Sequence, residues 1–276
     1  MYQEIYWKKA LEKTYKCVNS GDVIPLKTTD ITNTIYKKTD FIIRKLNTKK
    51  FKKNKFIGPS LNPFDPYETA LVLDKIGENH HLILNKYPVQ VGHILLITNS
   101  WKPQVGWLEK DDWNAIKSVN DDTSGLWFFN SGPLAGASQP HRHIQLLRRR
   151  SEEVSCPRED WFLNLAGNSN GNEKLGERTI AKAFNINNES INLYDVYIEL
   201  ADKIGLGNPE IDYVPKYPYN MLLTNNWIAL IRRERDYVHG FSINSLGFAG
   251  YILVTEKSDY NYLAKNGPEK LLENFV

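Results

Sequence analysis

The spacing of apolar residues predicts helices in three segments, near residues 5–15, 107–119 and 190–205. In the first segment, the residues expected to face the core are Ile5, Ala10, Leu11 and Tyr15. In the third segment, Ser190 is a candidate N-cap, and Gly205 is expected to end the helix. The helices are therefore separated by long stretches that must form other structure.

Between the helices, apolar runs bounded by turn residues predict strands. The segments 81–85 and 93–98 form an expected hairpin, with Pro88 and Gly92 in its turn. A second pair of expected strands, 125–132 and 141–147, is separated by a glycine-containing loop. Further expected strands follow in "YNMLLTNNWIALIRRER" and "SLGFAGYILVTEKS".

Two of these segments resemble each other, which suggests a degenerate internal duplication. They are "GHILLITNS" in the first half and "AGYILVTEKS" in the second. Duplicated units would bury one shared core, so we expect a single compact body with two pseudo-repeated halves, divided as 1–150 and 151–276.

Composition and charge limit the classes of protein to which this chain can belong. The net charge is +3, from 35 basic and 32 acidic residues, which does not fit a dedicated nucleic-acid-binding protein. Cys17 and Cys156 are the only cysteines, too few for a disulfide framework. No apolar run approaches the roughly 18 residues that span a membrane. We therefore expect a cytoplasmic protein without nucleic-acid or membrane partners.

Five lysines stand between Lys49 and Lys55, followed by Gly58, Pro59 and Pro63, and they indicate a loop. This loop is either a solvated surface segment or a basic flap over a polyanionic ligand, because lysine ammonium groups attract phosphate.

The most informative motif is the alternating row His141, His143 and Gln145 in "HRHIQLL". Side chains at alternate positions of a strand project to the same face. Three interpretations are open: incidental placement at a sheet edge, a metal site, or a nucleophilic imidazole. A metal would need a third ligand, and no histidine or acidic residue lies in the adjoining loop.

The chemistry of a nucleophilic imidazole accounts for all three residue types. A neutral imidazole at His143 can attack phosphorus when an acceptor holds its other ring nitrogen. Gln145 can donate hydrogen bonds to phosphoryl oxygens, but it cannot deliver a proton. The leaving group must then depart unprotonated, as a phosphate or nucleotide can. The row therefore favours nucleotidyl transfer between phosphates over hydrolysis.

The row and its surroundings resemble the diadenosine tetraphosphate phosphorylases, also called ATP adenylyltransferases, in the transferase branch of the histidine-triad superfamily. The similar stretches are "NSGPLAGASQPHRHIQ", "NPF", "LNKYPVQVGHILLIT", "YNMLLTNNW" and "SLGFAGYILVT". The resemblance implies an α+β fold with a histidine-triad-like antiparallel sheet and flanking helices. It implies a first half that carries the H-x-H-x-Q site and an ATP adenylyltransferase-like second half.

The resemblance also implies a reaction and its residues. Diadenosine tetraphosphate and phosphate would become ATP and ADP, reversibly, through an adenylylated His143, with the main-chain carbonyl of His141 orienting its ring. The implied catalytic residues are His143, His141 and Gln145, and the implied substrate-binding residues are Asn85, Asn130, Ser138, Gln139 and Lys55. Asn130 and Ser138 could instead be ordinary turn residues, and Asn85 could simply end a strand. Mg²⁺ is expected on the polyphosphate rather than in a protein site.

Two other functions compete with this one. A hexose-1-phosphate uridylyltransferase shares the H-x-H-x-Q chemistry, but it usually has extra metal-ligating cysteines and histidines, for which this chain has no candidates. A non-catalytic module could use the same row to bind adenylate. A covalent adenylyl-protein would separate the enzyme from the module.

Overall fold

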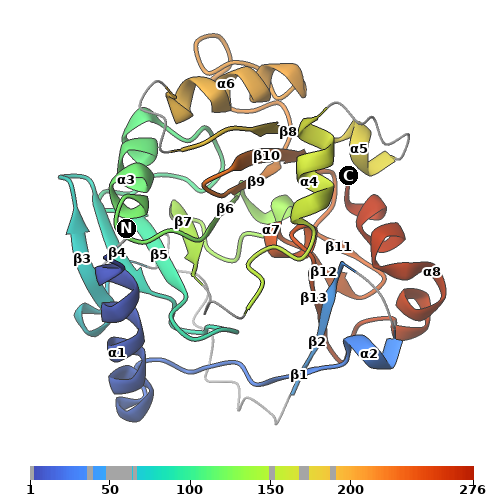
Figure 1. Ribbon diagram of the computed structural model, residues 1–276, viewed down its shortest axis with the longest axis horizontal. Helices are drawn as coiled ribbons and strands as arrows, with labels where there is room; N and C mark the ends of the chain where they lie inside the picture. Colours follow the sequence, from blue (N-terminus) through green and yellow to red (C-terminus); the bar gives the residue numbers. More distant parts are fainter. Residues whose placement is uncertain are drawn as a thin grey trace.

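The computed structural model describes residues 3–35, 40–47, 64, 67–148, 153–167, 174–186 and 191–276. Its central feature is an eight-stranded sheet with the order β3-β4-β5-β7-β6-β9-β10-β8, in which every neighbouring pair is antiparallel (Figure 1). The strands are β3 (Val72–Ile76), β4 (His80–Leu84), β5 (Ile94–Thr98), β6 (Leu126–Asn130), β7 (His143–Leu147), β8 (Thr179–Ala183), β9 (Tyr219–Leu223) and β10 (Trp227–Arg232). The pairing of β6 with β9 joins the two halves of the chain into one sheet.

Helices cover both faces of this sheet. One core cluster joins buried side chains of α1 (Ile5–Ser20), α3 (Lys110–Asn120) and α6 (Leu193–Lys203) to one face of the sheet. A second cluster joins α4 (Glu159–Ala166), α7 (Ser245–Phe248) and α8 (Tyr260–Leu272) to the other face. The remaining helical segments are α2 (Thr32–Ile35), α5 (Lys174–Glu177), η1 (Thr69–Leu71), η2 (Pro133–Ala135) and η3 (Glu273–Phe275).

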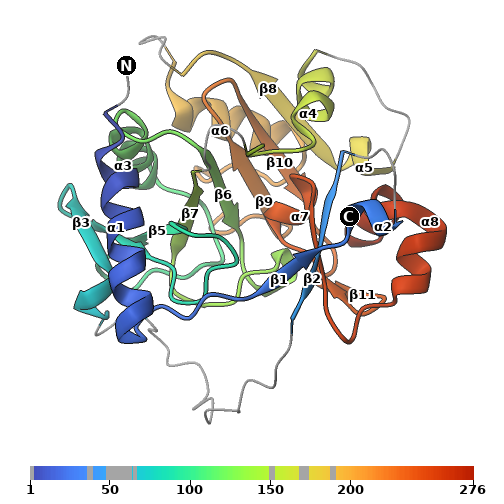
Figure 2. The ribbon, with the colours of Figure 1, turned by 60° about the horizontal axis from the view of Figure 1, so that its bottom comes forward.

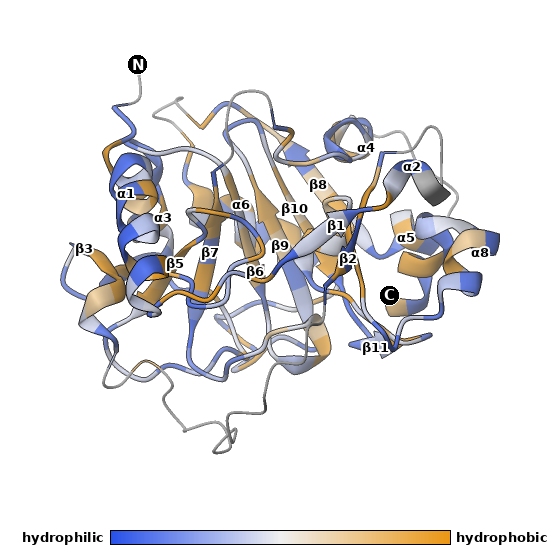
Figure 3. Ribbon diagram, turned by 90° about the horizontal axis from the view of Figure 1, so that it is seen from below, coloured by the Kyte–Doolittle hydropathy of each residue, from blue (hydrophilic) through white to orange (hydrophobic). Residues whose placement is uncertain are grey.

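Hydropathy agrees with this layering. The sheet strands are mostly hydrophobic in colour, whereas α1 carries hydrophilic and hydrophobic residues on one helix (Figure 3). Such a helix stabilises the fold by burying only its apolar stripe. No helix among the described residues is long and apolar enough to cross a membrane.

Two details of the helix predictions are corrected. In α1 the buried residues are Trp7, Ala10, Thr14 and Cys17, whereas Ile5 and Tyr15 are exposed. The stripe is therefore rotated from the predicted one, because Trp7 packs against Gly92.

The start of α6 also differs from its prediction. Asn192 is the N-cap, and its side chain accepts from the backbone N of Tyr194 at 3.0 Å. Ser190 lies outside the described residues. Gly205, with φ +77°, follows the helix end as expected.

A smaller sheet links the two ends of the chain. Its order is β1 (Thr28–Asp30), β2 (Ile42–Leu46) and β13 (Tyr251–Val254), and β13 runs parallel to β2. Figure 2 shows β1 and β2 as neighbouring antiparallel strands. The two remaining strands, β11 (Tyr237–Val238) and β12 (Phe241–Ser242), form a hairpin.

This arrangement bears on the suggested duplication. The first of the similar segments contains β5, which lies inside the large sheet between two antiparallel neighbours. The second contains β13, which lies in the small sheet and pairs in parallel with β2. The two segments share an apolar strand pattern but do not occupy equivalent positions. The expected division after residue 150 falls between β7 and α4.

Candidate active site

His143 is the first residue of β7, and its ring is held by the backbone two residues earlier in the chain. The ring Nδ1 lies 2.8 Å from the main-chain oxygen of His141, the contact that we predicted. A carbonyl oxygen only accepts, so Nδ1 carries the proton and Nε2 keeps its lone pair. Burial lowers the pKa of His143 to about 4, although the bond to His141 opposes that shift. The imidazole is therefore neutral at pH 7, as a nucleophile must be.

Gln104, from the loop between β5 and α3, fixes the backbone of the same residue. Its Oε1 accepts from His143 N at 2.8 Å, and its Nε2 donates to His143 O at 3.1 Å and to Asn130 O at 2.8 Å. The register of β6 with β7 extends only to Phe128 and Gln145. Beyond that pair the glutamine amide bridges the two strands and satisfies buried backbone groups.

Sequence reasoning missed Gln104. A single glutamine in a loop gives no periodic or spacing signal, and its importance depends on two strands separating in space.

The ring of His141 has a structural environment of its own. Its Nε2 lies 2.8 Å from the Thr98 carbonyl and 2.9 Å from the Thr98 hydroxyl. Phe64 stands edge-on to the rings of both histidines, with centroids 5.3 Å from His141 and 5.9 Å from His143. Trp101 contacts the His141 ring in the same way at 5.3 Å. His141 thus acts on His143 through its backbone, and its own ring is packed among aromatic groups.

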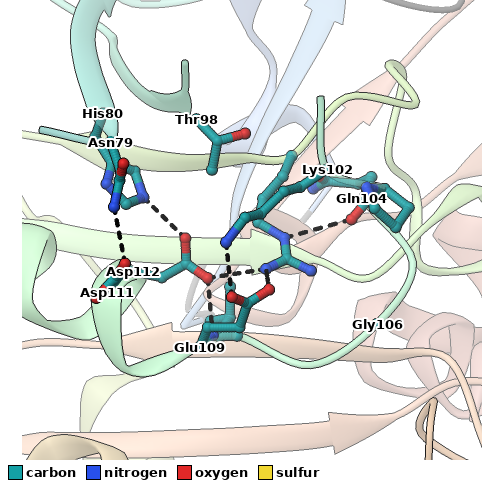
Figure 4. A network of polar contacts seen from close by, with 12 residues as sticks. Asn79, His80, Thr98, Lys102, Gln104, Gly106, Glu109, Asp111 and Asp112 are labelled. Atoms are coloured by element: carbon teal, nitrogen blue, oxygen red, sulfur yellow. Dashed lines mark hydrogen bonds and ion pairs between the residues drawn. The ribbon is translucent and has the colours of Figure 1, made fainter. Parts of the chain in front are cut away.

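Between the two histidines, Arg142 contacts the opposite face of the sheet, where it anchors β7 to α3. Its Nη1 donates to Glu109 Oε1 at 2.9 Å and to Asp112 Oδ2 at 3.0 Å. Asp112 also contacts His80 Nε2 at 2.9 Å, as Figure 4 shows. Burial opposes ionisation of Asp112, but the contacts with His80 and Arg142 hold its pKa below the ordinary value. The row is therefore held from the opposite face of the sheet by the ion pairs of Arg142, of which the pair with Asp112 is buried.

A cavity of about 570 Å³ lies on the face of the sheet that carries the row. Four predicted site residues line it: Asn85, Asn130, Ser138 and Gln145. Its other wall comes from the second half and from β2, through Arg44, Ser242, Asn244, Gly247, Tyr251 and Leu253. His143, His141 and Gln139 are not among the residues that line this cavity, and Lys55 lies outside the described residues.

Asn85 follows β4 and does two things at once. Its Oδ1 accepts from Tyr87 N at 3.0 Å, so its Nδ2 faces His93 and donates to Nδ1 at 3.1 Å. His93 is buried, and its ring lies 5.8 Å from that of Phe128. Asn85 thus closes the turn after the strand and also lines the cavity, so its two predicted roles are compatible.

The loop 131–139 brings the second half of the chain to the site. Gly136 has φ +86°, and a Cβ there would lie 2.7 Å from the carbonyl oxygen of Ile243 and 2.8 Å from Asn244 Cβ. Only glycine combines this conformation with so close an approach. The loop then carries Ser138, which is exposed, along the cavity wall.

Comparison with known proteins gives two matching family models. The model of the Ap4A phosphorylase N-terminal domain matches residues 1–161, and that of the ATP adenylyltransferase C-terminal domain matches residues 173–276. Ap4A is diadenosine tetraphosphate. These are the family and the enzyme class, a nucleotidyltransferase, that the sequence motifs predicted.

Individual relatives agree with this assignment. Protein APA1 of Saccharomyces cerevisiae is 27% identical over 221 residues, which cover 68% of this chain and 66% of that protein. Diadenosine 5',5'''-P1,P4-tetraphosphate phosphorylase 2 of the same yeast is 27% identical over 238 residues, 75% of this chain and 72% of that protein.

A solved structure shares the fold. The crystal structure of yeast Ap4A phosphorylase Apa2 in complex with AMP superposes with a TM-score of 0.72 at 24% identity, covering 99% of this chain and 96% of that one. The complex of Apa2 with Ap4A gives 0.71 at 22% identity, covering 99% and 98%. This likeness confirms the predicted α+β fold. The chain therefore belongs to the Ap4A phosphorylase family.

Proposed function

We propose that this protein cleaves diadenosine tetraphosphate with inorganic phosphate, giving ATP and ADP, through an adenylylated His143, and that it runs the reverse reaction as an ATP adenylyltransferase. The observation that carries the proposal is the bond from His143 Nδ1 to the carbonyl of His141, 2.8 Å long, which leaves Nε2 as a lone-pair nucleophile. Family membership supplies the substrate class, nucleotides linked by phosphates.

In the first half-reaction, His143 Nε2 attacks the α-phosphorus of one adenosine. A nitrogen–phosphorus bond forms while the bond from that phosphorus to the bridging oxygen breaks, and ATP leaves. In the second, an oxygen of inorganic phosphate attacks the same phosphorus, the nitrogen–phosphorus bond breaks, and ADP leaves. Both leaving and attacking phosphates are anions near neutral pH, with an ionisation near about pKa 6, so neither step needs a proton donor.

Gln145 suits that requirement. It lines the cavity two residues beyond His143 on the same face, and its amide can donate to the phosphoryl oxygens as negative charge develops there. It has no acidic proton to give. We propose that Asn130 and Ser138 contact the phosphates and that Asn85 contacts a ribose. Gln139 and Lys55 remain proposed contacts, the latter to the polyphosphate.

We propose that Mg²⁺ enters with the polyphosphate and keeps waters as its other ligands. Among the described residues that line the cavity, Glu153 is the one carboxylate, and it already accepts from Gln90 Nε2 at 2.9 Å. A cation carried by the substrate fits this wall better than a cation held by the protein. The protein is proposed to work in the cytoplasm, where its two buried thiols, Cys17 and Cys156, stay reduced.

The test is capture of the adenylyl-enzyme. Wild-type protein and His143→Ala are mixed with diadenosine tetraphosphate labelled on the α-phosphate, without free phosphate, and quenched in base, in which a phosphoramidate is stable. Wild type should bind label that phosphate then releases as ADP, and His143→Ala should lose at least about 10⁴-fold in turnover. Label that never becomes covalent would indicate an adenylate-binding module. Label from a UDP-hexose instead would indicate a uridylyltransferase.

A further inference from the structure

Asn130, at the end of β6, belongs to the first half of the chain but its side chain is held by the second. Its Oδ1 accepts from Asn220 Nδ2 at 2.8 Å and from Ser245 N at 2.9 Å, with the Ser245 hydroxyl 2.7 Å away. Asn220 faces Asn130 across the β6–β9 pair, and Ser245 begins α7. All three residues are buried to 1% exposure or less.

The direction of these hydrogen bonds follows from which groups can only donate. The backbone N–H of Ser245 only donates, so the atom of Asn130 that faces it must be the amide oxygen. The guanidinium of Arg233 only donates, and its Nη1 lies 2.5 Å from Asn220, so that atom is Asn220 Oδ1. The NH₂ group of Asn220 therefore faces Asn130 Oδ1 and the carbonyl of Ala135, each at 2.8 Å.

Arg233, which follows β10, is a fixed starting point for this chain of bonds. It is fully buried, and all five of its N–H groups donate, to Asn220 Oδ1 and to the carbonyls of Ala135, Arg235, Ile243 and Phe275. Burial lowers the pKa of Arg233 to about 9, with Asp236 opposing the shift. The guanidinium therefore remains charged at pH 7 and cannot become an acceptor.

We propose that Arg233 and Asn220 are positioning residues that fix the Asn130 amide with its oxygen turned into the second half and its NH₂ group turned to the cavity. In that orientation the NH₂ group donates to the α-phosphoryl oxygens of the nucleotide. This proposal rests on the proposed function. It adds the residues that orient one of the hydrogen-bond donors to the substrate, the Asn130 amide. A reversed amide would place NH₂ against the N–H of Ser245, leaving buried donors unpaired, so the orientation is set before substrate binds.

Asn220→Asp tests the relay with little change in size. A carboxylate at 220 still accepts from Arg233 but no longer donates to Asn130 Oδ1. It would accept from the NH₂ group of a reversed Asn130 amide, so only Ser245 would still oppose the reversal. A matched control is Asn120→Asp. Asn120 is also buried and also donates to a second asparagine, Asn225, at 3.0 Å, while its Oδ1 accepts from Trp127 at 3.1 Å. Neither Asn120 nor Asn225 lines the cavity.

The experiment is a double-mutant cycle on the first half-reaction. The rate of adenylyl-enzyme formation at saturating diadenosine tetraphosphate is measured for wild type, Asn130→Ala, Asn220→Asp and the double variant, together with each melting temperature. Asn220→Asp alone should slow the step by about 10- to 10²-fold, the scale of a misplaced catalytic contact. In the Asn130→Ala background it should slow the step by less than about twofold, because its effect passes through Asn130. Asn120→Asp should lower the melting temperature without changing the rate.

The proposal is overturned if Asn220→Asp slows the Asn130→Ala protein as much as it slows wild type, or if it leaves the wild-type rate intact. The same cycle with Arg233→Lys, whose ammonium lacks the guanidinium fork, decides the matter if the aspartate variant does not fold. Absence of any adenylyl-enzyme in wild type would instead refute the proposed function, so the two failures are distinguishable.

Discussion

His143, the proposed nucleophile, and Asn130, a proposed phosphate contact, are held from different parts of the chain. The ring and backbone of His143 are fixed by His141 and Gln104, which belong to the same half. The side chain of Asn130 is fixed by Asn220 and Ser245, from the other half. The proposed nucleophile is therefore held within one half, whereas the proposed donor depends on the assembly of both halves.

The difference suggests why the two halves share one sheet. β6 pairs with β7 on one side and with β9 on the other, so a shift of the second half relative to the first would carry Asn220 and Ser245 away from the Asn130 side chain. Antiparallel pairing along β6 and β9 limits such a shift, because a slip by one residue would turn every side chain to the wrong face.

After the loss of His143 itself, the largest effect should come from Gln145, the member of the row that lines the cavity. Gln145→His should lower phosphorolysis by about 10²- to 10³-fold, because one well-placed donor at a developing charge is lost. An imidazole at that position can also accept and deliver protons, so water should compete as acceptor and AMP should appear.

The ratio of ADP to AMP, measured from diadenosine tetraphosphate at saturating phosphate, checks this prediction. An unchanged ratio with an undiminished rate would exclude Gln145 from the mechanism. The shape of the pocket would then have to select the acceptor.

The next largest effect should follow loss of Gln104, the side chain that fixes the backbone of His143. Gln104→Leu removes three hydrogen bonds at once, two to the backbone of His143 and one to Asn130 O. Displacement of the imidazole should slow adenylyl-enzyme formation by about 10²-fold. The buried backbone groups left unpaired should lower the free energy of unfolding by about 1–3 kcal/mol.

Rates from rapid-quench experiments and a urea titration measure the two losses separately. Gln104→Glu is the sharper companion, because it keeps the acceptor for His143 N and loses only the donors. If Gln104→Leu is destabilised but forms the intermediate at the wild-type rate, the hydrogen bonds of Gln104 do not affect catalysis.

A smaller effect is expected where the halves meet at Gly136. In Gly136→Ala, the added Cβ would approach the carbonyl of Ile243 to 2.7 Å at a positive φ, so the loop or α7 must move. We expect a loss of about 1–3 kcal/mol in stability and about 10-fold in rate, because the loop carries Ser138 and α7 begins with Ser245.

Gly77→Ala is a suitable control, since Gly77 also has a positive φ of +57° but no heavy atom lies within 4 Å of its added Cβ. It should cost stability alone. Equal kinetic losses in both variants would argue that backbone strain in general, rather than contact between the halves, slows the reaction.

These contrasts also explain what the sequence could predict. The row at His141, His143 and Gln145 was readable because its residues are close in the chain and follow the period of a strand. The hairpin and the helix positions were readable from apolar spacing for the same reason. Asn130 and Ser138 could be named from the family motif, and the cavity includes both.

The partners that fix those residues could not be read in this way. Gln104 lies 39 positions from His143, and Asn220 lies 90 positions from Asn130, so no local period connects them. The buried face of α1 was misjudged because it depends on Trp7 meeting Gly92 from a distant hairpin. Tertiary contacts of this kind determine which apolar residues of a helix are buried and which polar residues hold the site.

The smallest expected effect is that of mild acid on the first half-reaction. Burial favours the neutral form of His143 and lowers its pKa to about 4, so the nucleophile is lost only as the pH falls through about 4. The rate of adenylyl-enzyme formation should therefore change little between pH 7 and 5, and no phosphate acceptor is present to titrate. An exposed histidine would lose half its reactivity near pH 6.5.

The free energy of unfolding should also fall as the pH is lowered. In the unfolded chain His143 takes up a proton near pH 6.5, before the folded protein does, so the stabilisation is present above that pH and is lost toward pH 4. Over that interval wild type should lose about 3 kcal/mol more than His143→Ala, whose other groups are unchanged. Urea titrations of both proteins at pH 7, 5.5 and 4 measure the difference. A rate midpoint near 6.5, with parallel stability profiles, would show that the imidazole is solvated and that its own half does not shield it.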